Sequence, residues 1–257
     1  MKKLIISFAL LTGVVFSSCN DSFLEKTPIT DLTEDNAFNS YDNFKSFMWP
    51  CYEMFTNNTI RTSLANYGQN GNYAGDCDAG YFEWKQESGY NAFAYQTVAS
   101  AASGNGWDFK SFIRRINIML SHIDSSAMNE EQKKHWRAVG YFFHSFWYME
   151  LIDRFGDIPW VDQVLQEDSP EAYGRREDRK VVADKVLERL LWAEKNIGNF
   201  TTSDGKNTIN QDCVRAAISR FTLREGTWRK YHELGDYAKY FEECVRVSEL
   251  LMSAYPK

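Results

Sequence analysis

The chain has 257 residues, of which 44% are hydrophobic and 25% charged, the composition of an ordinary globular protein. Its formal net charge is −6 at pH 7 and no run of Lys and Arg forms a basic stripe, which argues against nucleic acid as a partner. Aromatic residues make up 16% of the chain, more than a helical core usually needs, so we expect some of them to face a ligand.

Residues 1–18 have the features of a secretory signal peptide. Lys2 and Lys3 follow the first methionine, and the apolar run after them, residues 4–16, is shorter than the ~20 residues with which a helix crosses a bilayer. The small residues directly before Cys19 make this segment similar to the bacterial lipoprotein box, in which the thiol of the cysteine is acylated. We therefore expect a lipid on Cys19 and a tether over residues 19–39. An ordinary signal peptide that ends near a cysteine is the alternative.

From residue 40 onward, apolar residues recur at spacings of three and four, which predicts one helix after another. Asn129, with Gln132 in capping-box position, predicts a helix that begins at Glu130 and runs to about Phe155, where the turn 156–159 ends it. Five further apolar stripes predict helices near 44–55, 112–123, 182–197, 214–228 and 237–255. No alternating pattern competes with them, so the body, residues 40–257, is expected to be all-α.

Helices of this length in antiparallel succession suggest a solenoid of tetratricopeptide-like hairpins with long irregular loops. Two fragments resemble parts of the tetratricopeptide motif, Trp136-x₂-Val139-Gly140-x₂-Phe143 and Ala217-x₃-Phe221. Neither extends to the whole motif, so the prediction rests on topology more than on the motif. The final helix ends near Lys257 without a terminal cap. We expect it to pack against a following segment and the chain to be truncated.

One segment, residues 67–93, interrupts the helical pattern with many glycines, aromatic residues and short polar side chains. A long loop in a compact domain is usually functional, and its aromatic content argues against disorder. Flat aromatic rings can stack on the apolar faces of sugars, while amides and carboxylates bind their hydroxyls. The predicted carbohydrate-binding residues are Asn72, Tyr73, Asp76, Trp84 and Tyr90. For each residue alone, simple packing of the loop against the helices stays the alternative.

Four passages, in order along nearly the whole chain, carry a family resemblance: Cys19–Pro28, Trp107–Asn117, Tyr148–Pro159 and Arg215–His232. Together they resemble the SusD/RagB family, surface lipoproteins with which Bacteroidetes capture glycans for a TonB-dependent transporter. The resemblance implies a lipid-anchored location on the outer-membrane surface, an oligosaccharide ligand and a SusC-like TonB-dependent transporter as partner.

Two departures from the family pattern accompany this resemblance. His144-Ser145 stands where members usually carry Arg-Ala in the helix before the turn. Members are also about twice as long as this chain, so residues 40–257 would form the N-terminal half, with the C-terminal half missing. That half contributes part of the ligand platform in the family.

Other chemistry has weaker support in the sequence. Asp76, Asp78 and Glu87 imitate positions of a calcium loop, but Tyr81 stands where the motif needs glycine. The four histidines form no ligand pair, and no nucleophile elbow, phosphate loop or dinucleotide fingerprint occurs. We therefore expect no metal, no cofactor and no catalytic residue.

Single acidic and cysteine side chains have simple interpretations. Glu150 and Asp153 are expected to be solvated, and Asp157 to cap the turn after Gly156. Cys51 and Cys244 are expected to be buried thiols, while the state of Cys77 stays open.

The leading hypothesis is a non-catalytic glycan-binding lipoprotein that serves oligosaccharide uptake. A helical-repeat adaptor for protein–protein docking is the alternative, and a glycan hydrolase is a weaker third.

Overall fold

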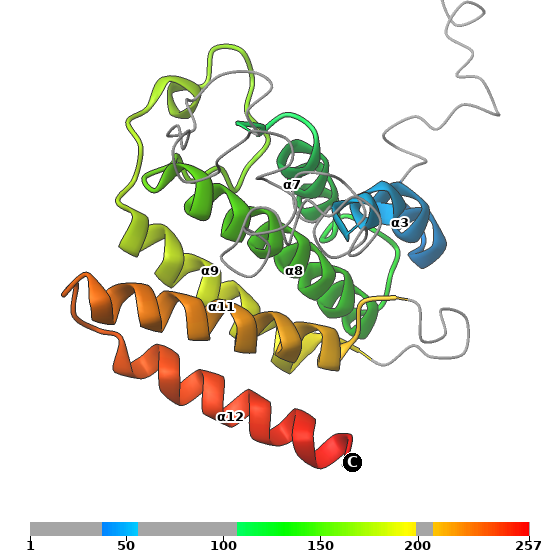
Figure 1. Cartoon of the computed structure of the whole chain (residues 1–257). Coiled ribbons are helices and arrows are strands. Elements are labelled where there is room, and N and C mark those ends of the chain that lie inside the picture. The colour runs from blue at the N-terminus through cyan, green and yellow to red at the C-terminus, as the bar shows by residue number, and fades with distance from the viewer. Residues whose placement is uncertain (1–37, 56–106, 199–207, 257) are drawn as a thin grey trace, which may run out of the picture. The chain divides into compact units, whose positions relative to one another are not determined.

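A computed structural model of the chain describes residues 38–55, 107–198 and 208–256 (Figure 1). These residues all belong to one compact unit, Phe38–Lys257. The signal peptide, the tether and the segment 67–93 lie outside the described residues, so the predictions for them stay predictions.

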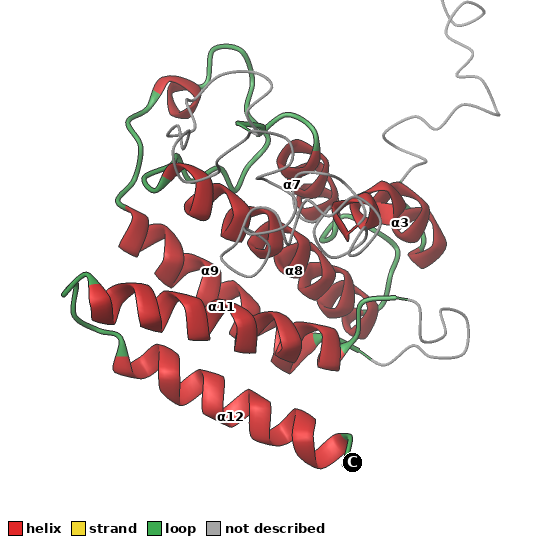
Figure 2. Ribbon diagram, viewed as in Figure 1, coloured by secondary structure: helices red, strands yellow, loops and turns green. Residues whose placement is uncertain are grey.

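The described residues form a succession of helices (Figure 2). In chain order these are α3 (Tyr41–Met48), the 3₁₀ helix η2 (Trp49–Phe55), α7 (Phe112–His122), α8 (Glu130–Phe155), the 3₁₀ helix η4 (Pro170–Tyr173), α9 (Arg179–Asn196), α11 (Gln211–Tyr231) and α12 (Ala238–Ala254). The only β-structure in the described ranges is an isolated antiparallel bridge between Ile158 and Glu177. The all-α prediction is confirmed.

The bounds predicted for α8 are confirmed, because both ends depend on local sequence. Asn129 Oδ1 accepts a hydrogen bond from the backbone N–H of Gln132 (2.9 Å), and Gln132 Oε1 accepts one from that of Asn129 (3.2 Å). At the other end Gly156 adopts φ = 70°, which side-chain-bearing residues rarely do. The predicted helix 44–55 instead divides at Trp49 into α3 and η2. Pro50 lacks the N–H that an α-helix interior requires, which accounts for the change.

Successive helices pack against one another in chain order, α7 on α8, α8 on α9, α9 on α11 and α11 on α12 (Figure 1). Two glycines allow close helix contacts. A Cβ at Gly140 in α8 would lie 2.7 Å from Leu120 Cδ2 of α7, and one at Gly226 in α11 would lie 2.8 Å from Phe241 Cε1 of α12. Antiparallel hairpins with small residues at their contacts are consistent with the tetratricopeptide-like prediction.

A buried ionic cluster joins α9, α11 and α12. Arg229, which is fully buried, donates from Nε to Glu225 Oε1 (2.8 Å) and from Nη2 to Asp184 Oδ1 (2.9 Å). Asp184 Oδ1 also accepts the hydroxyl hydrogen of Tyr240 (2.6 Å), and Arg179 Nη1 lies 2.7 Å from Glu225 Oε2. Since each buried charge has an opposite partner, the cluster fixes the relative placement of the three helices.

The structure corrects two predictions about acidic side chains. Asp153 is not simply solvated, because it forms an ion pair with Arg224 of α11. Asp157 does not cap the turn after Gly156. Its Oδ1 accepts a hydrogen bond from the backbone N–H of Arg179 (2.9 Å), the first residue of α9. The bridge between Ile158 and Glu177 brings the start of α9 back to this turn, which the local sequence did not indicate.

Three cysteines in the described residues are free thiols. Cys51 is buried as predicted, and burial raises the pKa of its thiol to about 12. Cys244 is only half-buried, contrary to the prediction, and its thiol donates to the carbonyl oxygen of Ser219 in α11 (3.5 Å). Within the described ranges, none of the helices combines the length and apolarity needed to cross a membrane.

Candidate functional site

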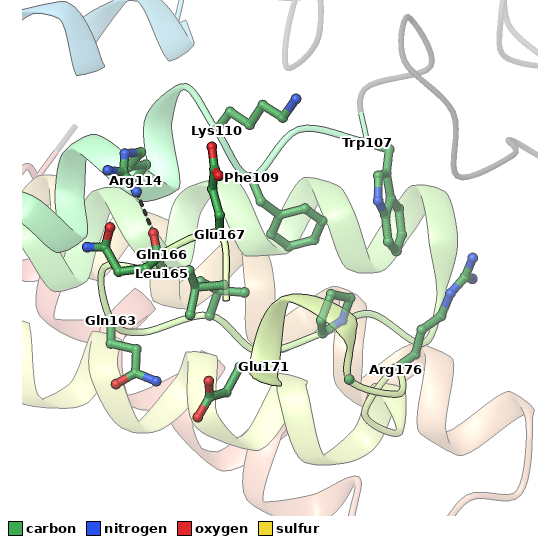
Figure 3. Close-up of a pocket in the computed structure, with 13 residues that line it drawn as sticks. Trp107, Phe109, Lys110, Arg114, Gln163, Leu165, Gln166, Glu167, Glu171 and Arg176 are labelled. Atoms are coloured by element: carbon green, nitrogen blue, oxygen red, sulfur yellow. Dashed lines mark hydrogen bonds between the residues drawn. The ribbon is translucent and has the colours of Figure 1, made fainter. Parts of the chain in front are cut away.

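A pocket of about 500 Å³ lies between the start of α7 and the segment that connects α8 to α9 (Figure 3). Its volume falls within the usual range for small-molecule sites. The apolar lining residues are Trp107, Phe109, Pro159, Val161 and Leu165. The polar and charged ones are Lys110, Arg114, Gln163, Gln166, Glu167, Glu171 and Arg176, beside Gly174. Figure 3 shows the two aromatic rings toward one end and the two glutamines toward the other.

Asp108 positions the two aromatic residues that flank it in the sequence. Its Oδ1 accepts hydrogen bonds from the backbone N–H groups of Lys110 (2.8 Å) and Ser111 (3.1 Å). Its carbonyl oxygen accepts one from the indole N–H of Trp147 in α8 (2.9 Å). The turn that leads into α7 is thereby attached to α8.

Trp107 forms an aromatic surface that is held from several sides. The rings of Phe109 and Phe155 meet it edge-on at centroid distances of 5.2 and 4.9 Å. The guanidinium carbon of Arg176 lies over the indole, 4.7 Å from the ring centroid. These contacts restrict rotation of the indole, so the ordering cost on ligand binding is reduced.

The opposite wall is the segment 156–178, which contains only one short 3₁₀ helix but is attached to α7 by side chains. Asn117 is buried and its Nδ2 donates to the carbonyl oxygens of Val161 (3.1 Å) and Gln163 (2.9 Å). One turn earlier in α7, Arg114 Nη1 donates to the carbonyl oxygen of Leu165 (2.7 Å), as Figure 3 shows. Three backbone carbonyls of the wall are therefore bound by one helix.

Two side chains of α8 hold the same wall from beneath. His144 Nε2 lies 2.9 Å from the carbonyl oxygen of Val161. The hydroxyl of Tyr148 donates to the carbonyl oxygen of Pro159 (3.0 Å) and accepts from the N–H of Val161 (2.7 Å). Burial lowers the pKa of His144 and raises that of Tyr148, so both side chains are neutral at pH 7. His144, the departure from the family pattern, is thus part of the support for the pocket.

The rim of the pocket offers free polar groups. Gln163, Gln166, Glu167, Glu171 and Lys110 are all exposed. Within the described part of the chain, no ion pair engages the two carboxylates or the ammonium group. Amides, carboxylates and an ammonium group next to aromatic rings form a donor and acceptor set suited to a polyhydroxylated ligand. No group of three potential metal ligands occurs among the described residues.

The predicted binding residues Asn72, Tyr73, Asp76, Trp84 and Tyr90 lie outside the described residues, and so does the predicted lipid site Cys19. The structure neither brings them to the pocket nor separates them from it. Sequence reasoning did not identify the residues between Gln163 and Arg176. The sequence feature that could have identified them is a stretch without helical periodicity, rich in Gln and Glu, that follows the turn at Gly156.

Comparison with known proteins gave consistent matches. The model of the SusD-like family, described as starch-binding and associating with the outer membrane, matches residues 22–223. A SusD-like protein of Formosa agariphila is 21% identical over 231 residues, which are 84% of this chain and 42% of that protein.

Solved structures match at low identity. A SusD-like protein from Bacteroides fragilis has a TM-score of 0.59 at 19% identity, over 86% of this chain and 41% of its own. A SusD-like carbohydrate-binding protein from Bacteroides vulgatus has 0.56 at 15%, over 86% and 46%. A laminarin-binding SusD-like protein has 0.54 at 14%, over 82% and 42%. The chain spans less than half the length of each of these relatives, and identities this low support the fold alone.

Proposed function

This chain belongs to the SusD-like family, and from that premise we propose that it is a non-catalytic carbohydrate-binding protein whose oligosaccharide ligand occupies the pocket of Figure 3. One observation carries the proposal: the indole of Trp107 is held in place at one end of a pocket whose rim carries free amides and carboxylates. A pyranose ring has an apolar face for the indole and hydroxyls for the rim.

We extend the proposal to parts of the chain that the structure does not describe. Asn72, Tyr73, Asp76, Trp84 and Tyr90 would add further contacts to the sugar. A lipid on Cys19 and the tether 19–39 would hold the protein at the outer-membrane surface, in keeping with the outer-membrane association in the family description. A SusC-like TonB-dependent transporter would take up the captured oligosaccharide.

The chain spans less than half of its relatives, so binding by this chain alone is part of the proposal. Native electrophoresis of the purified chain through gels that contain single neutral glycans, laminarin among them, tests it. We expect retardation in at least one gel and about tenfold weaker binding after Trp107→Ala, equivalent to ~1.4 kcal/mol. Trp84→Ala tests the segment 67–93 in the same assay.

Trp49→Ala is the matched control, because Trp49 is 51% exposed and does not line the pocket. Equal mobility in all gels, or equal weakening by Trp49→Ala and Trp107→Ala, would contradict sugar binding at this site. Release of reducing sugar by the purified chain would instead support a hydrolase.

The adaptor function keeps one specific observation in its favour. α11 exposes Leu223, Trp228 and Tyr231 on one face, and a contiguous apolar surface of this kind is typical of a docking site. The two functions are compatible, since this surface lies on a different element from those that form the pocket wall.

A further inference from the structure

One face of α11, orange in Figure 1, carries a second depression of about 470 Å³, which we call the α11 groove. Its lining residues recur at three- and four-residue spacings and therefore form one stripe along the helix. The stripe includes Arg220, Leu223, Arg224, Trp228, Tyr231 and His232. None of these residues belongs to the pocket of Figure 3.

The apolar part of the α11 groove is exposed. Leu223, Trp228 and Tyr231 are 55%, 42% and 77% accessible, and no described element covers them. Another face of the same helix is buried in the core, through residues such as Ile218 and Phe221. α11 therefore has a second apolar face in addition to the one that packing requires, and such a face marks an interaction surface.

The charged part of the α11 groove is basic, although the whole chain carries a net charge of −6. No lining residue is acidic. Arg224 is engaged by Asp153 and by the carbonyl oxygen of Met149 (3.2 Å). Arg220 has no hydrogen-bond or ion-pair partner among the described residues. Its guanidinium therefore has its full complement of donors available for an acidic group.

The indole of Trp228 is already stacked. The imidazole of His232 lies 3.8 Å from it between ring centroids, and the guanidinium carbon of Arg179 lies 4.6 Å from its centroid. Two side chains of the protein therefore hold the indole of Trp228 in place. Its neighbour Leu223 is aliphatic and offers neither a flat ring nor a polar group for a sugar, so it favours an apolar side chain of a polypeptide.

We propose that the α11 groove docks a short acidic segment of a partner protein, with a carboxylate on Arg220 and apolar side chains against Leu223 and Tyr231. From Arg220 to Tyr231 the helix rises ~16 Å, at about 1.5 Å per residue. An extended peptide covers this length with about five residues, at ~3.3 Å each. The segment recognised therefore has an acidic residue at one end and apolar residues within the next few positions.

Fluorescence polarisation with the whole chain tests this docking surface. The probes are four labelled hexapeptides. Two of them contain one glutamate and otherwise Leu and Phe, with the glutamate first in one peptide and last in the other. The remaining two carry lysine in place of the glutamate. We expect one of the glutamate peptides to bind at least tenfold more tightly than its lysine counterpart. Arg220→Glu and Tyr231→Ala should each weaken that binding at least tenfold.

Matched controls separate this effect from general changes of the surface. Lys134→Glu reverses an exposed cation on α8, and Met252→Ala removes a side chain of α12 that is 65% exposed. Both should leave binding unchanged, and circular dichroism should show the same helix content in all variants. Trp107→Ala should also leave peptide binding unchanged, because the pocket of Figure 3 is a separate site.

Three results of the peptide measurements overturn the proposal: failure of both glutamate peptides to bind, equal binding of glutamate and lysine peptides, or binding that survives both groove substitutions. Displacement of the bound peptide by an oligosaccharide that also binds the Trp107→Ala chain would identify the groove as a sugar site and likewise overturn it.

Discussion

The imidazole Nε2 of His144 lies 2.9 Å from the carbonyl oxygen of Val161, so a side chain from the middle of α8 holds the backbone of the pocket wall. The imidazole is fully buried and its Nδ1 has no partner. The proton therefore resides on Nε2, which donates to the carbonyl. Burial, together with the positive charge of Arg189, lowers the pKa of His144 well below its usual value.

This contact predicts a specific loss of stability in acid. In the unfolded chain His144 is protonated below about pH 6.5, whereas in the folded chain it stays neutral to a lower pH. Below about pH 6.5 the unfolded chain therefore binds one more proton than the folded chain, so the free energy of unfolding falls by up to ~1.4 kcal/mol for each pH unit. Urea denaturation between neutral pH and pH 5 should show this slope in the wild type and a flatter one in His144→Gln.

His232→Gln is the control for the acid effect, because it replaces an exposed imidazole. It should leave the wild-type slope unchanged. If the slopes of the His144→Gln and wild-type chains are equal, His144 is not the group responsible.

Asn117→Leu should loosen the pocket wall. The substitution keeps the branched shape and the number of heavy atoms of the side chain but removes the donor to the carbonyl oxygens of Val161 and Gln163. We expect a loss of about 2 kcal/mol in the free energy of unfolding, since buried acceptors lose their partner. Limited proteolysis should cut faster between residues 161 and 167. Ser121→Ala, which changes an exposed hydroxyl of α7, should have neither effect.

Gly226→Ala should destabilise the protein more than Gly140→Ala. At Gly226 the new methyl group meets the ring of Phe241, which must move as a unit, while at Gly140 it meets the flexible ends of Leu120 and Met119. Overpacking costs about 1–3 kcal/mol, and alanine regains about 0.5–1 kcal/mol of helix propensity. Thermal denaturation should therefore show a clearly lower Tm for Gly226→Ala and a Tm near the wild type for Gly140→Ala. The reverse order would contradict the described contact between α11 and α12.

Glu225→Gln should be strongly destabilising. Glu225 and Arg229 are both inaccessible to solvent, and removal of the carboxylate charge leaves the buried guanidinium without its closest counter-charge. Breaking a buried pair in this way costs about 3 kcal/mol or more. Asp124→Asn removes the partner of Arg137 in a pair whose aspartate is 81% exposed, and should cost less than ~1 kcal/mol. Urea denaturation of the two variants gives the comparison directly, and similar losses would show that the cluster is not tightly buried.

Local chemistry made much of the helical framework predictable. The capping box at Asn129 and the glycine after Phe155 identify both ends of α8 because each acts on neighbouring residues. The pocket wall was not predictable in this way. Its carbonyl groups carry no sequence signal, and the side chains that bind them, Asn117 and Tyr148, belong to other helices.

The sequence by itself determined the helical class, most helix positions and the family resemblance, because periodicity and caps are properties of adjacent residues. Only the tertiary structure decided that Asp157 accepts a hydrogen bond from the first N–H of α9, that Asp153 pairs with Arg224, and that Trp107 faces a wall built after Gly156. These relationships depend on where the chain returns in space. A polar side chain can meet its partner at many sequence separations, and packing of the helices selects one of them.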